Sequence, residues 1–308
     1  MRLYLGLAAA AALLGISSAS AAEPPAKAGL EAIAVEANGA KGVVRYKHFP
    51  VAGKREAIIY LHGDLPPKAA NGDSTDEDLR ILQSIERRLR SFSADRLVPT
   101  VMIARPGYLW SSGDPEERHS KTHNKWIRDA IEGVVTRLGI ERYALVGQSG
   151  GSTAIALTLP IGERQSPCVV LGSGSFSWIK TARHQSRMFN MRPITRAIER
   201  QIESRDPAPI GTVTEIPVVE GRRIIVLGDP RDWRTPFAAQ VEYWAAMRDR
   251  GHEAIFMVKE AFDKERHGMS GEAMTAGERC LNETRPDEAP AAVTPAPANH
   301  ASGARPHA

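Results

Sequence analysis

Short apolar runs alternate with amphipathic stretches along most of this chain. The first strand-like segment, residues 42–49, alternates apolar and polar positions, which predicts an edge strand. Later runs are largely apolar and are bounded by glycine, proline or charged residues, which predicts strands that are buried on both faces of a sheet. These runs cover residues 57–63, 98–107, 167–174 and 222–229, and residues 143–149 and 253–260 predict two further strands.

The stretches between the runs have the spacing of amphipathic helices. Ser74 and Glu77 form a capping box, and the apolar positions from Leu79 to Phe92 share one helical face behind it. The other predicted helices cover residues 124–139, 152–159, 236–251 and 270–283. Strands that alternate with helices need crossover connections, so we expect an α/β fold. Its sheet would be mostly parallel, with about seven or eight strands, helices on both faces and functional groups at the carboxyl ends of the strands.

The two ends of the chain do not predict a packed core. Residues 1–22 combine one positive charge, a charge-free apolar stretch too short for a comfortable membrane span, and small residues. This pattern predicts a cleaved signal peptide, and a retained N-terminal anchor is the alternative. Residues 23–41 predict a linker and N-terminal extension before a folded domain at residues 42–283, and the proline- and alanine-rich residues 284–308 predict a disordered tail.

Composition narrows the class of protein. The 308 residues are 42% hydrophobic and 25% charged, with a net charge of +4, and acidic and basic residues are interspersed, so we expect no nucleic-acid partner. The predicted signal peptide implies an exported protein, periplasmic or extracellular, and because no second long apolar run appears we expect no stable membrane insertion after signal cleavage. An oxidising compartment permits a disulfide between Cys168 and Cys280, and two buried free thiols are the alternative.

The segment "GQSGG" contains the strongest candidate for a nucleophile, Ser149. It lies where a predicted strand gives way to a predicted helix, with a glycine two residues away on each side. A nucleophile on so sharp a turn takes a strained backbone conformation that bulky neighbours would obstruct. The turn also aims the Gly150 N–H, near a helix N-terminus, at a developing oxyanion.

A serine nucleophile needs a base and an acid that orients the base. Of nine histidines, His267 alone follows the last predicted strand and precedes the last predicted helix, which places it at the carboxyl edge of the sheet. The preceding strand ends in "GDPRDWRTP", which supplies Asp232 and Asp229. Asp232 is the expected acid because it lies within the turn before a helix, and Asp229 is the alternative.

A second oxyanion donor is expected from the loop "HGDLP" after the strand at residues 57–63. Gly63 would allow a close approach to the elbow, and the Asp64 N–H would point inward. His62 would brace this loop through hydrogen bonds. The alternative for His62 is a half-buried histidine without a catalytic part, and the two interpretations predict almost the same contacts.

These motifs together resemble the α/β-hydrolase superfamily, in its branch with a serine nucleophile. The resemblance rests on "HG", then "RPGY", then the elbow, then "GDPRDWRTP" and a late histidine, and it covers about residues 42–283. The order Ser149, Asp232, His267 matches the superfamily order of nucleophile, acid and histidine. The resemblance implies an α/β-hydrolase fold and activity without a metal or organic cofactor. Where many relatives insert a large helical lid, this chain has only residues 175–221, which predict a small cap.

The expected reaction is hydrolysis of a carboxylic ester, because a serine at the elbow disfavours the aspartate-using branches of the superfamily. Tyr108, Trp110 and Trp178 are the expected apolar contacts of the substrate, with buried packing as the alternative for each. The partner would be a small-molecule ester or a peptide-like substrate. An exported serine peptidase or amidase is the first alternative, and a non-catalytic binding protein of the same fold is the second. The pattern indicates no oligomeric state.

Overall fold

The computed structural model describes residues 27–65, 76–162, 166–204 and 207–284. The predicted signal peptide, residue Ser74 of the capping box and the predicted tail beyond residue 284 lie outside the described residues. No helix in the described part of the chain is long and apolar enough to cross a membrane.

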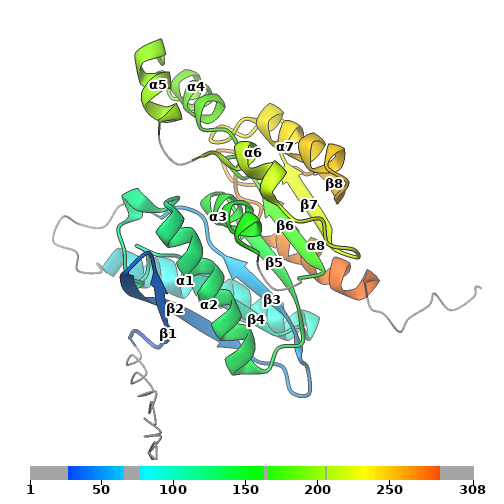
Figure 1. Ribbon diagram of the computed structural model, residues 1–308. Coiled ribbons are helices and arrows are strands. Elements are labelled where there is room, and N and C mark those ends of the chain that lie inside the picture. The colour runs from blue at the N-terminus through cyan, green and yellow to red at the C-terminus, as the bar shows by residue number, and fades with distance from the viewer. Residues whose placement is uncertain (1–26, 66–75, 163–165, 205–206, 285–308) are drawn as a thin grey trace, which may run out of the picture.

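One sheet organises the fold (Figure 1). Its strands are β1 (Glu31–Ala37), β2 (Ala40–Phe49), β3 (Glu56–Leu61), β4 (Thr100–Ala104), β5 (Arg142–Gln148), β6 (Cys168–Gly172), β7 (Arg223–Gly228) and β8 (Glu253–Val258). Their order in the eight-stranded sheet is β1-β2-β4-β3-β5-β6-β7-β8. The pairs β1–β2 and β2–β4 are antiparallel, and all neighbours from β4 to β8 are parallel. The predicted mostly parallel sheet is confirmed.

Helices cover both faces of this sheet (Figure 1). They are α1 (Asp76–Arg96), α2 (Lys121–Leu138), α3 (Gly150–Thr158), α4 (Trp178–Met188), α5 (Arg196–Glu203), α6 (Pro209–Thr212), α7 (Phe237–Asp249) and α8 (Ser270–Glu283), with short 3₁₀ helices η1 (Pro115–Glu117), η2 (Leu159–Ile161) and η3 (Val213–Glu215). Helices α2, α3 and α7 pack on one face, and α1 and α8 pack on the other.

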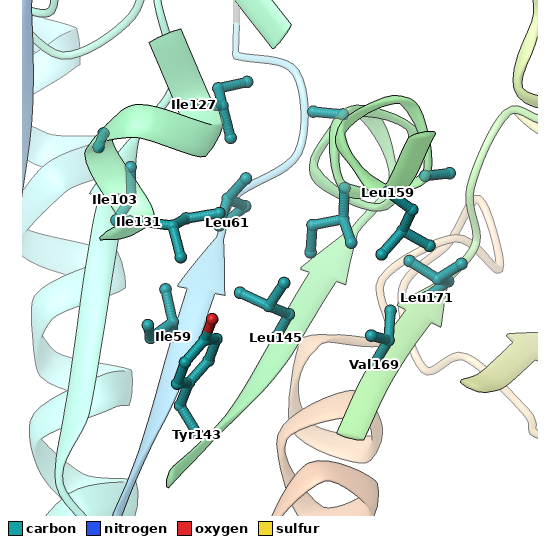
Figure 2. Packing of buried hydrophobic residues seen from close by; sticks show 14 of the residues in the cluster. Ile59, Leu61, Ile103, Ile127, Ile131, Tyr143, Leu145, Leu159, Val169 and Leu171 are labelled. Atoms are coloured by element: carbon teal, nitrogen blue, oxygen red, sulfur yellow. The ribbon is translucent and has the colours of Figure 1, made fainter. Parts of the chain in front are cut away.

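The core follows the two-residue period of the strands. On β3, Ile59 and Leu61 point into the cluster under α2 and α3, whereas Ile58 and Tyr60 point toward α1 and α8. Figure 2 shows Ile59 and Leu61 beside Leu145 of the neighbouring strand β5, with Leu171 of β6 beyond it, and Ile127 and Ile131 of α2 close to Leu61. Both sides of each central strand are therefore buried, which is why these runs are continuously apolar.

The start of the domain differs from the prediction. Residues 31–37 were expected to belong to an extension, but they form β1, and residues 42–49 lie in β2, which has a partner on both sides. On this side of the sheet the edge strand is β1, whose alternating sequence "EAIAVEA" buries one face against α2 and leaves its glutamates outside. The sheet thus begins before the expected boundary at residue 42.

The segment between β6 and β7 is helical. It contains α4 and α5, followed by α6 and η3, within the range predicted to form a small cap. Figure 1 shows α4 and α5 projecting away from the sheet and its covering helices. We refer to residues 178–204, which hold these two helices, as the cap helices.

Candidate active site

Ser149 occupies a strained turn between β5 and α3. Its φ of 55° and ψ of −124° lie in a region that residues with a side chain rarely adopt. A side chain on Gly151 would collide with the backbone of Leu61, so only glycine lets α3 begin this close to β3. The turn therefore has the backbone strain and the glycine spacing of a nucleophile elbow.

The structure brings Ser149, His267 and Asp232 together. The Oγ atom of Ser149 lies 2.7 Å from Nε2 of His267. On the other side of the ring, Nδ1 lies 2.9 Å from Oδ2 and 3.0 Å from Oδ1 of Asp232. His267 and Asp232 are buried, and the backbone N–H of His267 donates to Asp263 at 2.7 Å, which holds the histidine loop in place. The three side chains form one hydrogen-bonded chain that ends at the serine oxygen.

Three hydrogen bonds from its own turn hold the Asp232 carboxylate in place. Its Oδ1 accepts from the backbone N–H groups of Arg234 at 2.7 Å and Thr235 at 2.9 Å, and its Oδ2 accepts from the Thr235 hydroxyl at 2.8 Å. Asp229, the alternative acid, instead accepts from backbone N–H groups of Arg231 and Ala261 at 2.8 and 2.9 Å. Burial opposes ionisation of Asp229, but these hydrogen bonds outweigh it and lower its pKa. Asp232, not Asp229, reaches the histidine.

The loop after β3 lies beside the elbow as expected, but the Asp64 side chain adds a feature that was not predicted. Its carboxylate lies against Gly150, where a side chain on that glycine would collide with it. Oδ1 lies 2.6 Å from Nη2 of Arg105, and Oδ2 lies 3.3 Å from Nε of Arg118. Burial would raise the pKa of Asp64, but the two guanidinium groups outweigh it and hold that pKa well below its usual range.

Arg105 is the residue that sequence reasoning missed. It follows β4 in "RPGY", is 1% exposed, and lies 4.8 Å over the ring of Tyr108. Its Nε and Nη1 atoms have no hydrogen-bond partner within the described ranges of the chain. A buried cation therefore sits directly behind the Asp64 carboxylate. The available signal was an arginine at the carboxyl end of a buried strand, a position where charge is costly unless it is paired.

His62 ties two strand ends together, as predicted for a bracing residue. The backbone N–H of Arg105 donates to Nε2 of His62 at 3.3 Å, so Nδ1 carries the proton and donates to the Gly63 carbonyl at 2.7 Å. Burial, together with the charge of Arg105, lowers the pKa of His62 to about 3, so the ring is neutral at physiological pH. A Cβ atom added at Gly63 would lie 2.6 Å from the side-chain oxygen of Gln148.

A cavity of about 1570 Å³ opens above Ser149, between this loop and the cap helices. Trp178, one of the three predicted substrate contacts, lines it and stacks on His119 at a centroid distance of 4.8 Å. Tyr108 and Trp110 were predicted to contact the substrate, but neither lines the cavity. Both pack against the core cluster on the α1 and α8 side of the sheet, in a turn after β4 where Leu109 and Trp110 have positive φ. Other residues that line the cavity are Asp64, Arg118, Ser175, Thr181, Gln185, Ile202 and Arg234.

The cap helices are attached to the loop that carries the acid. Nε2 of His184 lies 2.8 Å from the backbone carbonyl of Asp232, and Nε2 of Gln185 donates to the carbonyl of Arg234 at 2.9 Å. Helix α4 thus forms one wall of the cavity and also supports the turn beneath the histidine.

Cys168 of β6 and Cys280 of α8 form a disulfide, with 5.9 Å between their Cα atoms. Both residues are buried. The sequence left open a disulfide or two buried free thiols, and the structure contains the disulfide. It fastens α8, which directly follows the histidine loop, to the centre of the sheet.

Compared by sequence with known families and with curated proteins, the chain matches none of them. Solved structures are similar in fold. An esterase from Pyrococcus furiosus matches with a TM-score of 0.56 at 11% identity, over 83% of this chain and 89% of that one. An esterase from Pyrobaculum calidifontis matches with a TM-score of 0.54 at 16% identity, over 85% and 86% of the two chains.

A further match is the acylaminoacyl peptidase of Pyrococcus horikoshii, with a TM-score of 0.50 at 14% identity, over 82% of this chain but 39% of that one. Together with the eight-stranded, mostly parallel sheet, these similarities show that the chain has the α/β-hydrolase fold.

Proposed function

From the α/β-hydrolase fold as a premise, we propose that this protein is a serine hydrolase that cleaves carboxylic esters through an acyl-enzyme. The observation that carries the proposal is the hydrogen-bonded chain from Asp232 through His267 to Ser149 at the edge of a large cavity. The fold alone hosts many reactions, so the proposal rests on this geometry and not on the similar structures.

In the first half of the reaction, Ser149 Oγ attacks the ester carbonyl carbon while His267 Nε2 takes the hydroxyl proton. Asp232 accepts the Nδ1–H hydrogen bond, which fixes the ring tautomer and stabilises the imidazolium. The carbonyl oxygen becomes an oxyanion, held by the N–H groups of Gly150 and Asp64. Gly150 is the first residue of α3, so its N–H has no partner within the helix. Collapse of the tetrahedral adduct expels an alkoxide, which takes the proton from His267 and leaves as the alcohol.

In the second half, a water molecule replaces the alcohol. His267 removes one of its protons as the water oxygen attacks the acyl carbon. The second tetrahedral adduct then releases the carboxylic acid, and the proton returns to Ser149. No metal or organic cofactor takes part in these steps.

Labelling with a fluorophosphonate probe tests the proposal. The wild-type chain should be labelled at one site, and Ser149→Ala should abolish the labelling. Ser175→Ala is the matched control, because Ser175 lines the same cavity but its hydroxyl bonds Thr181 instead of a histidine. Labelling that survives Ser149→Ala, or a wild-type chain that is never labelled, would contradict the proposal and favour a binding protein with this fold.

A serine peptidase or amidase is the second candidate, favoured by the similarity to an acylaminoacyl peptidase. Matched ester and anilide substrates with the same acyl group separate the two. An esterase should show much higher kcat/KM for the ester than intrinsic leaving-group reactivity explains. Comparable kcat/KM values for both substrates would favour the peptidase.

We also propose that the mature protein is exported to the periplasm or the cell exterior after removal of residues 1–22, with residues 175–221 as its small cap. Support comes from the N-terminal pattern of charge, apolar stretch and small residues, and from a disulfide, which persists in oxidising compartments. Mass spectrometry of the protein from separated cell fractions tests this. A full-length chain confined to the cytosol would contradict it.

A further inference from the structure

We propose that the tip of the cap, residues 187–193 between α4 and α5, docks on an anionic lipid surface. The sequence of this cap tip is "RMFNMRP", in which arginines flank three large apolar residues. The proposal deepens the proposed function by naming where its substrates are met, since the cavity opens beside the cap helices. Binding to the surface itself does not depend on catalysis.

The cap tip displays apolar side chains to solvent. Met191 is 61% exposed, Phe189 41% and Met188 39%. Soluble proteins rarely keep such residues together at the surface unless another surface covers them in use. Their neighbours Arg187, Asn190, Arg192 and Pro193 are exposed as well, so the whole segment stands free of the domain.

The backbone of the cap tip is fixed, so the exposure does not come from a loose loop. The N–H of Phe189 bonds the carbonyl of Gln185 at 2.9 Å, and the N–H of Met191 bonds that of Ser186 at 2.8 Å. Asn190 lies between them with a φ of 50°, as in the turn that commonly ends a helix. The hydroxyl of Ser186 also donates to the carbonyl of Arg192 at 2.8 Å. The apolar side chains are therefore held outward by hydrogen-bonded main chain.

Positive charge is concentrated in the same place. The cap helices and cap tip contain six basic residues and two acidic ones, and this excess equals the net charge of +4 of the entire chain. Lys180 pairs with Glu242, and Arg183 pairs with Glu199. The four remaining basic residues are all exposed, and none has a counter-ion in the part of the chain that the structure describes: Arg187, Arg192, Arg196 and Arg200.

Arginines around exposed Phe and Met side chains match the two layers of a membrane surface. Guanidinium groups bind phosphates of anionic headgroups, and apolar side chains enter the boundary between headgroups and acyl chains. A nucleic acid would use the charge but would leave the methionines uncovered. A second copy of the chain would have to bring an acidic patch to the four exposed arginines.

Docking at the cap tip would place the cavity next to the surface. Trp178 and Gln185 of α4 and Ile202 of α5 line the cavity, and these two helices carry the cap tip at their shared end. In Figure 1 they project from the rest of the molecule, so a flat surface can meet them without meeting the sheet. Esters of membrane lipids or of molecules dissolved in the membrane would then reach Ser149 over a short path.

Co-sedimentation of the full-length chain, less its signal peptide, with lipid vesicles tests the proposal. We expect binding to vesicles of phosphatidylcholine with about one third phosphatidylglycerol, weak binding to phosphatidylcholine alone, and a steep loss of binding as salt rises. Because one arginine near an anionic surface contributes about fivefold in partitioning, R187Q/R192Q should lower the partition coefficient at least tenfold. F189S/M191S should lower it at least fivefold, since it removes the apolar part.

Matched controls lie elsewhere on the surface. R80Q/R87Q removes the same charge from exposed positions of α1, and F262S removes an exposed apolar side chain outside the cap, so both should bind within twofold of wild type. All tip variants should hydrolyse a water-soluble short-chain ester at the wild-type rate, because the cap tip does not line the cavity. This soluble activity separates the two proposals: its absence from the wild-type chain counts against the esterase, while vesicle binding is scored independently.

Several results would overturn the proposal. The wild-type chain could fail to bind the anionic vesicles, or either tip variant could bind them as well as wild type does. Tighter binding to duplex DNA than to vesicles of equal phosphate content would identify a nucleic acid as the partner. A dimer in sedimentation velocity that the tip substitutions dissociate would identify a second copy of the chain.

Discussion

The Cys168–Cys280 disulfide is expected to contribute a large part of the stability of this domain. It joins residues 112 positions apart, from the middle of the sheet to the last helix. Closing a loop of that length removes about 16 cal/mol/K from the unfolded chain, or about 5 kcal/mol at 25 °C on the chain-entropy account. Residual structure in the unfolded chain reduces this value, so we expect Cys168→Ala/Cys280→Ala to lower the free energy of unfolding by about 3–5 kcal/mol.

Urea denaturation followed by circular dichroism measures this difference. The oxidised wild-type protein is compared with the double alanine variant at the same pH. Wild-type protein unfolded and refolded with a thiol reductant should match the variant, which controls for the two small cavities that alanine leaves. Oxidant should raise the unfolding midpoint of the reduced wild-type protein and leave that of the variant unchanged, because the variant has no thiol to oxidise.

A loss below about 1 kcal/mol would refute this reasoning. Thiol titration of the unfolded, unreduced wild-type protein then identifies the faulty step. Two free thiols would mean that the bridge does not form. No free thiol would mean that the bridge forms without restricting the unfolded chain as the entropy account requires.

Three other predictions concern the site. Asp232→Asn should lower kcat for ester hydrolysis by about 10³–10⁴-fold, because it removes the carboxylate that orients the histidine. Asp229→Asn should lower the Tm and leave kcat within about tenfold, and the reverse ranking of the two variants would identify Asp229 as the acid. Arg105→Gln should lower kcat by about tenfold or more with little change in KM, because the Asp64 carboxylate beside the oxyanion loses its main counter-charge. Arg105→Lys should recover most of the loss, and an unchanged kcat in a folded Arg105→Gln variant would show that this counter-charge does not support catalysis. His62 has a pKa of about 3 in the folded protein against 6.5 when unfolded, so the free energy of unfolding should fall by up to about 1.4 kcal/mol per pH unit as pH drops from 6.5 toward 3. Urea midpoints of His62→Asn should depend less steeply on pH, and an equal pH dependence would contradict the lowered pKa of His62.

Much of the architecture follows from patterns within short stretches of the chain. The apolar run at residues 143–149 predicts β5, and the residues from 270 to 283 predict α8 with the observed bounds. The helix expected from residue 124 begins at Lys121, because the Ser120 side chain caps it by accepting from the N–H of His123 at 3.2 Å. Periodicity and capping are local, so a sequence carries them without knowledge of the fold.

Strand β1 shows where local pattern becomes insufficient. Its sequence "EAIAVEA" alternates as a half-buried strand should, yet in the sequence it lies between a predicted linker and a short turn. A lone strand is not stable, and this one exists because β2 pairs with it along its whole length. Its assignment depends on a partner strand and on α2, which follows about 80 residues later.

The sequence by itself determined the alternation of strands and helices, the elbow at Ser149 and the chain order of acid and histidine. Only the tertiary structure decided that Asp232 and not Asp229 meets His267, that Arg105 lies behind Asp64, and that Tyr108 and Trp110 turn into the core. The physical reason is the distance along the chain. Repeating patterns act over a few residues, whereas the contacts of this site depend on where strand ends separated by about 30 residues or more arrive in space.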